Sequence, residues 1–165
     1  MYRLVILCFV ALTALGADLE KRDCARMFHP HSLRCCKVSA EVKEKMMMTD
    51  GLKECFKLPK DPVTCELELC VAKMRGFATD DDKLDLTKLG EVMTKDIDDK
   101  DLLADLKTNC INGDIQNYGP PEFCDFMKMK YCVSMQMLNH CTEWNDAGDC
   151  NQLKGAVGEC VKLLA

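Results

Sequence analysis

The spacing of apolar residues along this chain is the spacing of helices. From about residue 39 onward, most apolar positions recur three or four residues apart, which places them on one face of a helix. The clearest stripe is formed by Val63, Leu67, Cys70, Val71 and Met74. No segment shows the alternation of apolar and polar residues that is typical of a half-buried strand. The sequence therefore predicts an all-α fold, a compact bundle of about six to seven helices.

Capping residues and helix breakers indicate where these helices begin and end. Ser39, Asp85 and Asp98 can each cap a helix N-terminus, and Asp61 followed by Pro62 is a strong start signal. The expected helices cover residues 39–50, 52–56, 61–75, 86–93, 99–110, 121–139 and 150–164.

The N-terminus has the length and order of a secretory leader. Arg3 precedes the apolar run 4–15, and the small residues Gly16 and Ala17 follow it. This run is too short for a membrane span, which needs about 20 residues. We therefore interpret residues 1–17 as the signal peptide of a secreted, extracellular protein that does not insert into membranes.

The remaining chain, residues 18–165, has the length of one domain. Its first part, residues 18–34, shows no clear periodicity, and we expect an extended arm that is tethered through Cys24. Residues 142–165 would form a C-terminal extension of the helical domain.

Thirteen cysteines in 165 residues are the most unusual feature of the composition. Removal of the leader removes Cys8 and leaves an even number, which in an oxidising compartment favours pairing into up to six disulfides. A zinc site would need closely spaced ligands such as Cys-x-x-Cys, but the chain has no such pair and only three histidines. We therefore expect no metal ion and no cofactor.

Charge and missing motifs argue against several function classes. The formal net charge of −5, with both signs interspersed, is unfavourable for binding nucleic acid or an anionic membrane. A secreted phospholipase would carry a catalytic histidine soon after the pair Cys35-Cys36, but residues 37–39 contain none. The acidic segment 80–91 lacks the fifth ligand and the glycine of a calcium loop. No serine or cysteine hydrolase motif is present, so we expect no enzymatic activity.

The order and spacing of six cysteines resemble the signature of insect odorant-binding proteins. These six are Cys36, Cys65, Cys70, Cys110, Cys132 and Cys141. The context is similar as well, since residues 33–36 lead into a capped helix and the helix with Cys70 ends at Gly76 before an acidic loop. The extra cysteines and the Cys-Cys dipeptide resemble the C-plus subgroup of that family. They are Cys24, Cys35, Cys55, Cys124, Cys150 and Cys160.

The resemblance implies an interlaced pairing, in which the first of the six cysteines bonds to the third, the second to the fifth and the fourth to the sixth. In this chain the implied disulfides are Cys36–Cys70, Cys65–Cys132 and Cys110–Cys141. The other six cysteines would pair among themselves in one of 15 ways, which the sequence does not rank. Cys65 and Cys70 are five residues apart and would diverge by about 140° on an ideal helix, so a local distortion or a different bridge is implied there.

The resemblance also implies a function, that of a carrier enclosing a small hydrophobic molecule such as an odorant or pheromone in an internal apolar cavity. Adaptable methionines and a few aromatic rings suit such a cavity. The candidate ligand-binding residues are Met74, Phe77, Leu89, Met93, Leu103, Leu106, Phe123, Met127, Tyr131, Met135 and Leu138. Tyr131 is the favoured polar contact to the ligand.

Other features leave alternatives open. Protonation of His140, beside Cys141, could loosen the cavity. A chemosensory receptor is a potential partner under the resemblance, while the oligomeric state stays open. The alternative function is that of a disulfide-rich secreted interaction or effector protein without a ligand cavity.

Overall fold

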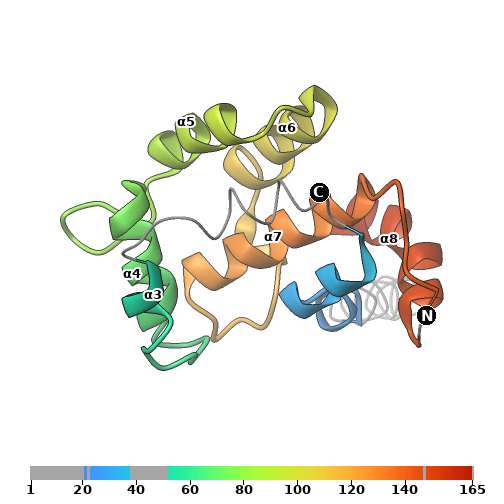
Figure 1. Cartoon of the computed structure of the whole chain (residues 1–165), viewed down its shortest axis with the longest axis horizontal. Helices are drawn as coiled ribbons and strands as arrows, with labels where there is room; N and C mark the ends of the chain where they lie inside the picture. Colours follow the sequence, from blue (N-terminus) through green and yellow to red (C-terminus); the bar gives the residue numbers. More distant parts are fainter. Residues whose placement is uncertain (1–20, 22, 38–51, 147, 165) are drawn as a thin grey trace, which may run out of the picture.

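The computed structural model of the whole chain is mainly helical (Figure 1). It describes residues 21, 23–37, 52–146 and 148–164. These ranges contain two isolated β-bridges but no strand, and none of their helices is long and apolar enough to cross a membrane. The predicted all-α class is confirmed. The predicted leader and the predicted helix at 39–50 lie outside the described residues.

Several helix boundaries agree with the sequence prediction. The short helix after residue 52, the helix capped by Asp85 and the C-terminal helix are all present. The helices are η1 (Pro30–Cys35), α3 (Leu52–Cys55), α4 (Glu66–Arg75), α5 (Leu86–Asp96), α6 (Lys100–Leu106), η2 (Lys107–Ile111), η3 (Ile115–Asn117), α7 (Asp125–Asn139) and α8 (Cys150–Leu164).

The N-terminal arm is helical, so the prediction of an extended arm is wrong. Residues 23–27 are helical, and η1 follows after His29, whose side chain accepts a hydrogen bond from the backbone N–H of His31. Cys24 and Phe28 lie one helical turn apart and are both buried. Two apolar positions are too few to give a periodic pattern in the sequence, which is why this short helix was not predicted.

α4 begins at Glu66 and not at the predicted Asp61. The Asp61 carboxylate accepts a hydrogen bond from the backbone N–H of Val63 and caps a turn. Cys65 follows in the left-handed conformation, with φ of 56°, and Cys70 lies inside the helix. This is the local distortion that the five-residue spacing implied, because the two cysteines do not share one regular helix.

Two further helices start later than predicted. The cap of α6 is Asp99 and not Asp98, since the Asp99 carboxylate accepts hydrogen bonds from the backbone N–H groups of residues 101 and 102. α7 starts at Asp125 and not at Pro121, because residues 120–123 form a turn and Cys124 is the N-cap. A proline is compatible with a turn as well as with a first helical position.

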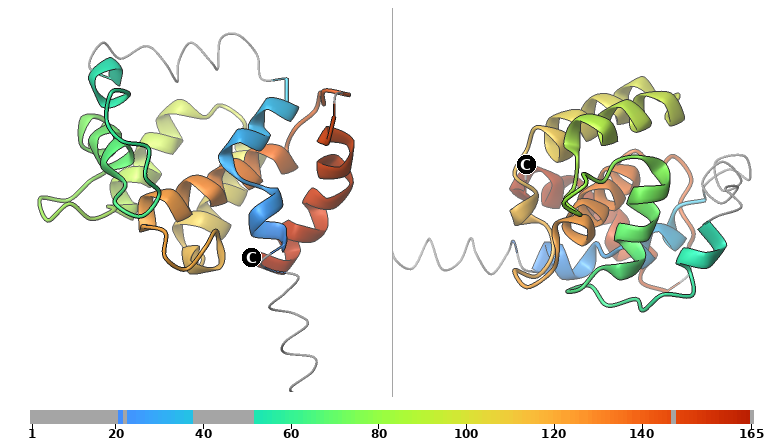
Figure 2. Two further views of the ribbon diagram at one scale, coloured as in Figure 1. Left: turned by 90° about the horizontal axis from the view of Figure 1, so that it is seen from below. Right: turned by 90° about the vertical axis from the view of Figure 1, so that its left-hand side faces the viewer.

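α7 is the central element of the fold (Figure 1). It packs against η1, η2, η3, α4, α6 and α8. α3 and α4 lie near one end of α7, while α8 and the N-terminal helical segments lie near the other, and α5 and α6 cross one side (Figures 1 and 2). The side chains of α7 therefore reach most of the molecular interior.

Six disulfides cross-link these elements in two sets. In the nested set, each bond encloses the next along the chain: Cys24–Cys160, Cys35–Cys150 and Cys36–Cys141. The interlaced set lies entirely inside the segment that Cys36–Cys141 encloses, and consists of Cys55–Cys70, Cys65–Cys124 and Cys110–Cys132.

The three disulfides implied by the resemblance are wrong in their partners. Cys36–Cys70 is replaced by Cys36–Cys141, Cys65–Cys132 by Cys65–Cys124, and Cys110–Cys141 by Cys110–Cys132. Cys36 is held next to Trp144 by a backbone bridge, and the N–H of Lys37 donates to the carbonyl of Glu143. This pairing of distant backbone segments, which the sequence does not reveal, brings Cys36 beside Cys141.

The order of pairing that the resemblance implied is nevertheless present in the interlaced set. Among the six cysteines of that set, the first bonds to the third, the second to the fifth and the fourth to the sixth. The order is retained because Cys55 takes the first place, Cys124 the fifth and Cys132 the sixth. Cys36 and Cys141, which the sequence analysis put in the signature, belong to the nested set instead.

Candidate ligand-binding interior

Most of the predicted ligand-binding residues meet in one hydrophobic core. Leu89 and Met93 enter it from α5, Leu106 from α6, and Met135 and Leu138 from α7, and all five are buried. The partly buried Phe77, Leu103 and Tyr131 pack against the same core. The spacing of three and four residues on these helices therefore places the predicted side chains together, as expected for one buried face on each helix.

Three predicted residues lie outside this core. Met74 is 43 % exposed on α4, and its sulfur lies 3.5 Å from the sulfur of Cys55, so it is a surface residue beside a disulfide. Phe123 and Met127 are half-buried at the N-terminal end of α7, where the ring of Phe123 meets that of Tyr131 edge-to-face at 5.8 Å. Met74 is on the outward side of its helix, which periodicity alone does not distinguish from the inward side.

The segments that the nested disulfides join contribute to the same core. Phe28 from the N-terminal segment is fully buried, as is Leu164 at the end of α8, and Leu153 and Val157 accompany them. The sequence pattern predicted an arm and a C-terminal extension in these regions. Their side chains complete the interior instead.

Two polar groups, which the sequence analysis did not select, lie deep in this interior. Tyr118 is 1 % exposed and Gln136 is fully buried. The Oε1 atom of Gln136 accepts a hydrogen bond of 3.2 Å from Nδ2 of Asn109. Apart from their contact with each other, the Tyr118 hydroxyl and the Nε2 atom of Gln136 have no hydrogen-bond partner among the described residues. Burial raises the pKa of Tyr118, and the neighbouring Gln136 side chain partly opposes that rise.

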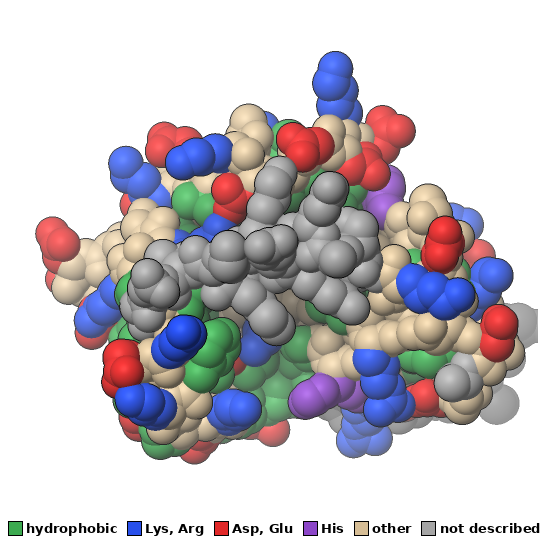
Figure 3. Space-filling model, viewed as in Figure 1, with side chains coloured by type: hydrophobic (Ala, Val, Ile, Leu, Met, Phe, Trp, Pro, Cys, Tyr) green, Lys and Arg blue, Asp and Glu red, His purple; other side chains and the backbone are tan. Residues whose placement is uncertain are grey.

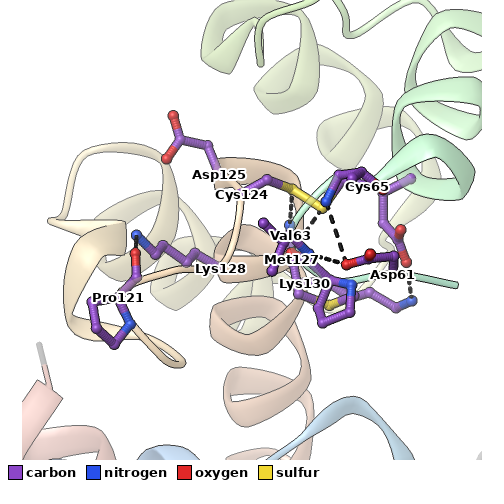
Figure 4. The surroundings of a disulfide bond; sticks show 12 residues. Asp61, Val63, Cys65, Pro121, Cys124, Asp125, Met127, Lys128 and Lys130 are labelled. Atoms are coloured by element: carbon purple, nitrogen blue, oxygen red, sulfur yellow. Dashed lines mark hydrogen bonds and ion pairs between the residues drawn. A yellow bond between two sulfur atoms is a disulfide. The ribbon is translucent and has the colours of Figure 1, made fainter.

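A charged pair ties α4 to α7 at the edge of the core. Nζ of Lys130 donates to Oε1 of Glu68 at 2.9 Å, and the Glu68 side chain is only 9 % exposed (Figure 4). The second oxygen of this carboxylate is buried and has no hydrogen-bond partner in the described part of the chain. The nearby Cys65–Cys124 bond joins the same two regions, so this end of α7 is held both covalently and electrostatically.

Lys128 is the most deeply buried ammonium group that the structure describes, at 4 % exposure. Its Nζ donates to the side-chain oxygen of Gln116. It also donates, at 3.1 Å, to the carbonyl of Pro121 (Figure 4). Both acceptors belong to the connection between η2 and α7. We interpret Lys128 as a structural contact that fastens this connection to the helix.

The predicted polar contact, Tyr131, is half-buried, and burial raises the pKa of its hydroxyl. His140, at the C-terminal end of α7, contacts Asp105 of α6, with 2.7 Å between Nε2 and the carboxylate oxygen. This contact links the end of α7 to α6. It lies next to Cys141 of the nested set.

Two surface depressions are open to solvent. One lies between α5 and η2, and is bordered by residues such as Thr94 and Lys107. The other lies between the N-terminal helical segment and α8, near Met27 and Glu159. Charged side chains of both signs are interspersed over the face seen in Figure 3. Neither depression is the internal apolar cavity that the sequence predicts.

Comparison with known proteins gives no relative from which to transfer a function. No family model, no curated protein and no solved structure matches this chain.

Proposed function

We propose that this protein is a secreted, non-enzymatic carrier that encloses a small hydrophobic molecule, such as an odorant or pheromone, in its interior. The observation that carries the proposal is the order of pairing in the interlaced disulfide set. Six cysteines allow 15 pairings, and the order found is the one that the resemblance to insect odorant-binding proteins implies. The agreement extends to the order but not to the identity of the first, fifth and sixth cysteines.

The composition of the core supports the same proposal. Met93, Met129 and Met135 are buried together with leucines of α5, α6 and α7. Methionine side chains are unbranched and rearrange at low cost, which suits an interior that must accept guests of different shape. Transfer of apolar ligand surface out of water would provide the driving force, about 25 cal/mol per Å².

The disulfides and the leader support secretion. Six disulfides are typical of proteins that fold in an oxidising compartment, and the leader-like pattern of residues 1–17 is the expected route to it. A chemosensory receptor would be a partner if the role is sensory. The alternative, an effector without a cavity, would use the outer surface of the same helical scaffold.

A displaceable apolar probe tests the proposal. The oxidised, monodisperse protein is titrated with a neutral fluorescent naphthylamine, and we expect saturable uptake at about one site per chain. Long-chain alcohols and ketones should displace the dye. Full reduction of the disulfides should abolish uptake, because the interior is then no longer constrained. An absence of saturable uptake by the oxidised protein would favour the effector function.

A matched pair of methionine variants locates the site. Met135→Ala removes a side chain that is 1 % exposed in the core, whereas Met74→Ala removes one that is 43 % exposed on α4. We expect the first to change dye affinity by about fivefold or more and the second to leave it unchanged, since only Met135 would line the guest. Equal effects of the two variants would place the dye on the surface.

A further inference from the structure

Two buried polar atoms in the core, which have no partner except each other among the described residues, point to the chemistry of the guest. The Tyr118 hydroxyl lies just after η3, and Nε2 of Gln136 is on α7, against which η3 packs. Tyr118 is 1 % exposed and Gln136 is fully buried. The contact between the two side chains, which opposes the rise in the pKa of Tyr118, satisfies at most one donor and one acceptor. A buried polar group without a hydrogen bond costs about 1–3 kcal/mol, so the donors that remain favour binding of a molecule that offers an acceptor.

The donors and acceptors at this point are unequal in number. Oε1 of Gln136 accepts from Asn109, which fixes the amide so that Nε2 offers its two N–H donors to the interior. Tyr118 adds one O–H donor, and its oxygen can accept from Nε2. The raised pKa of Tyr118 keeps this hydroxyl protonated at neutral pH. After any contact between the two side chains, donors without an acceptor remain.

We propose that Tyr118 and Gln136 bind the polar end of the hydrophobic guest, and that they select guests ending in a hydrogen-bond acceptor such as a ketone, aldehyde or ester oxygen. This inference rests on the proposed carrier function and adds the ligand class to it. An alkane offers no acceptor. A protonated amine offers only donors and would bring an unpaired charge into the core.

The surroundings of the pair suit such a guest. Tyr118 and Gln136 share the core with Leu106, Met129 and Met135. A molecule whose oxygen meets these two side chains would lay its hydrocarbon part along these apolar residues. The predicted contact Tyr131 is only half-buried and would be less completely desolvated.

The experiment measures displacement of the naphthylamine dye by three straight-chain competitors of equal length, a methyl ketone, an alkane and a primary amine. We expect the wild type to bind the ketone about tenfold more tightly than the alkane, and the amine more weakly than either. In Tyr118→Phe and in Gln136→Met, which keep the side-chain volume, the preference for ketone over alkane should fall to about twofold. Affinity for the dye and the alkane should stay within about twofold.

Ser134→Ala is the control, because it removes a buried hydroxyl of α7 that already donates to the carbonyl of Lys130, and it should keep the wild-type preference. A second measurement uses the infrared carbonyl stretch of the bound ketone, which hydrogen bonding lowers. The frequency should rise in Tyr118→Phe but not in Ser134→Ala. Dye uptake by the wild type without a preference for the ketone would overturn this inference while leaving the carrier function in place. The same holds if the ketone preference is unchanged in Tyr118→Phe and Gln136→Met and the carbonyl frequency is unchanged in Tyr118→Phe. No dye uptake by the wild type would overturn both.

Discussion

The interlaced and the nested disulfides fasten two regions of one small domain in different ways. The interlaced set joins α3, α4, η2 and the N-terminal part of α7 by bonds whose loops overlap. The nested set joins the N-terminal helical segments to α8 and to the end of α7 by bonds that enclose one another. Overlapping loops restrain one another. Nested loops can open one after another, beginning with the outermost bond.

Loop closure explains why these two sets should differ in energy. In the chain-entropy model, a disulfide that closes a loop of about 15 residues stabilises by about 3 kcal/mol and one of about 100 residues by about 4.7. Cys35–Cys150 spans 115 residues, yet Cys36–Cys141 already holds its two ends close, so that only roughly ten residues of new loop are closed. No other disulfide among the described cysteines holds Cys65 and Cys124 close together, so the bond between them closes a much longer loop.

The largest predicted effect compares removal of one bond from each set. Cys65→Ala with Cys124→Ala should lower the free energy of unfolding by about 3–5 kcal/mol, since the remaining bonds leave a long path between the two positions. Cys35→Ala with Cys150→Ala should lower it by about 2–3 kcal/mol. Guanidinium unfolding followed by circular dichroism, with the other disulfides intact, measures both.

Cys65 and Cys35 are both buried, at 1 % and 0 % exposure, whereas Cys124 is half-buried and Cys150 is 3 % exposed. Removal of Cys35–Cys150 therefore takes away the more deeply buried pair of sulfurs, so a larger loss for Cys65–Cys124 would report on the loops and not on the cavity. An equal loss in the two variants would mean that the topology of the set has no energetic consequence.

The next prediction concerns reduction by a small thiol. Cys36 and Cys141 are both half-buried, whereas Cys110 and Cys132 are both fully buried. Attack by a thiolate needs access to a sulfur, so Cys36–Cys141 should open at least about tenfold faster than Cys110–Cys132, equivalent to about 1.4 kcal/mol in activation free energy. Timed alkylation and peptide mass spectrometry identify the free cysteines. Early labelling of Cys110 or Cys132 would contradict the prediction that the fully buried bond is reduced more slowly than the half-buried one.

The sequence predicted this fold best where local chemistry decides the outcome. α5 begins directly after Asp85 because the carboxylate of this N-cap residue accepts from the N–H of Lys88, and a capping aspartate is visible in the sequence. α8 has the predicted bounds because its apolar stripe is regular. The disulfide partners depend instead on contacts between distant segments. Asn145, whose N–H donates to the carbonyl of Cys35, is one example, and no local pattern reports such a contact.

The candidate site was predictable to a similar degree. The apolar residues Leu89, Met93 and Leu106 follow from helical periodicity and meet in the core. Tyr118 and Gln136 were missed, because a tyrosine after a loop and a glutamine between two methionines normally indicate exposed positions. The proximity of Gln136 to Cys132, one turn earlier on a buried face, was the only sequence signal for its burial.

A smaller effect is expected from one ion pair in each region. Lys130→Met leaves the carboxylate of Glu68, 9 % exposed, without its partner, and should lower the free energy of unfolding by about 1–2 kcal/mol. The cost is less than for a fully buried pair because Lys130 itself is 45 % exposed. Arg34→Met breaks the Arg34–Asp149 pair near the nested set, where both side chains are mostly exposed, and should cost less than about 1 kcal/mol.

The effects of the two substitutions should also differ in their dependence on ionic strength. Raising the ionic strength should reduce the small effect of Arg34→Met toward zero, because exposed charges are screened, while the effect of Lys130→Met should change little. Thermal unfolding of the two variants at low and high salt measures this. A larger loss for Arg34→Met than for Lys130→Met would show that the pair near the nested set is the stronger one.

The smallest predicted effect is a pH dependence confined to the nested region. Burial lowers the pKa of His29, helped by the positive charges of His31 and Arg34 and opposed by Asp149. The folded state thus binds the proton more weakly than the unfolded state, in which the histidine has its ordinary pKa of about 6.5. The stabilising contribution of neutral His29 is complete above pH 6.5 and is lost as the pH falls from there through the folded pKa.

Protonation of His29 also removes an acceptor, since its Nδ1 accepts the hydrogen bond from the N–H of His31 that caps η1. Hydrogen exchange of the His31 amide, corrected for its intrinsic pH dependence, should therefore be less protected at pH 5.5 than at pH 7.5. His29→Asn keeps a capping oxygen that does not titrate, so its protection should be the same at both pH values. Amides of α4, in the interlaced region, are the internal reference and should not respond. A loss of protection in α4 as large as that at His31 would mean that acid acts on the whole domain rather than on this one cap.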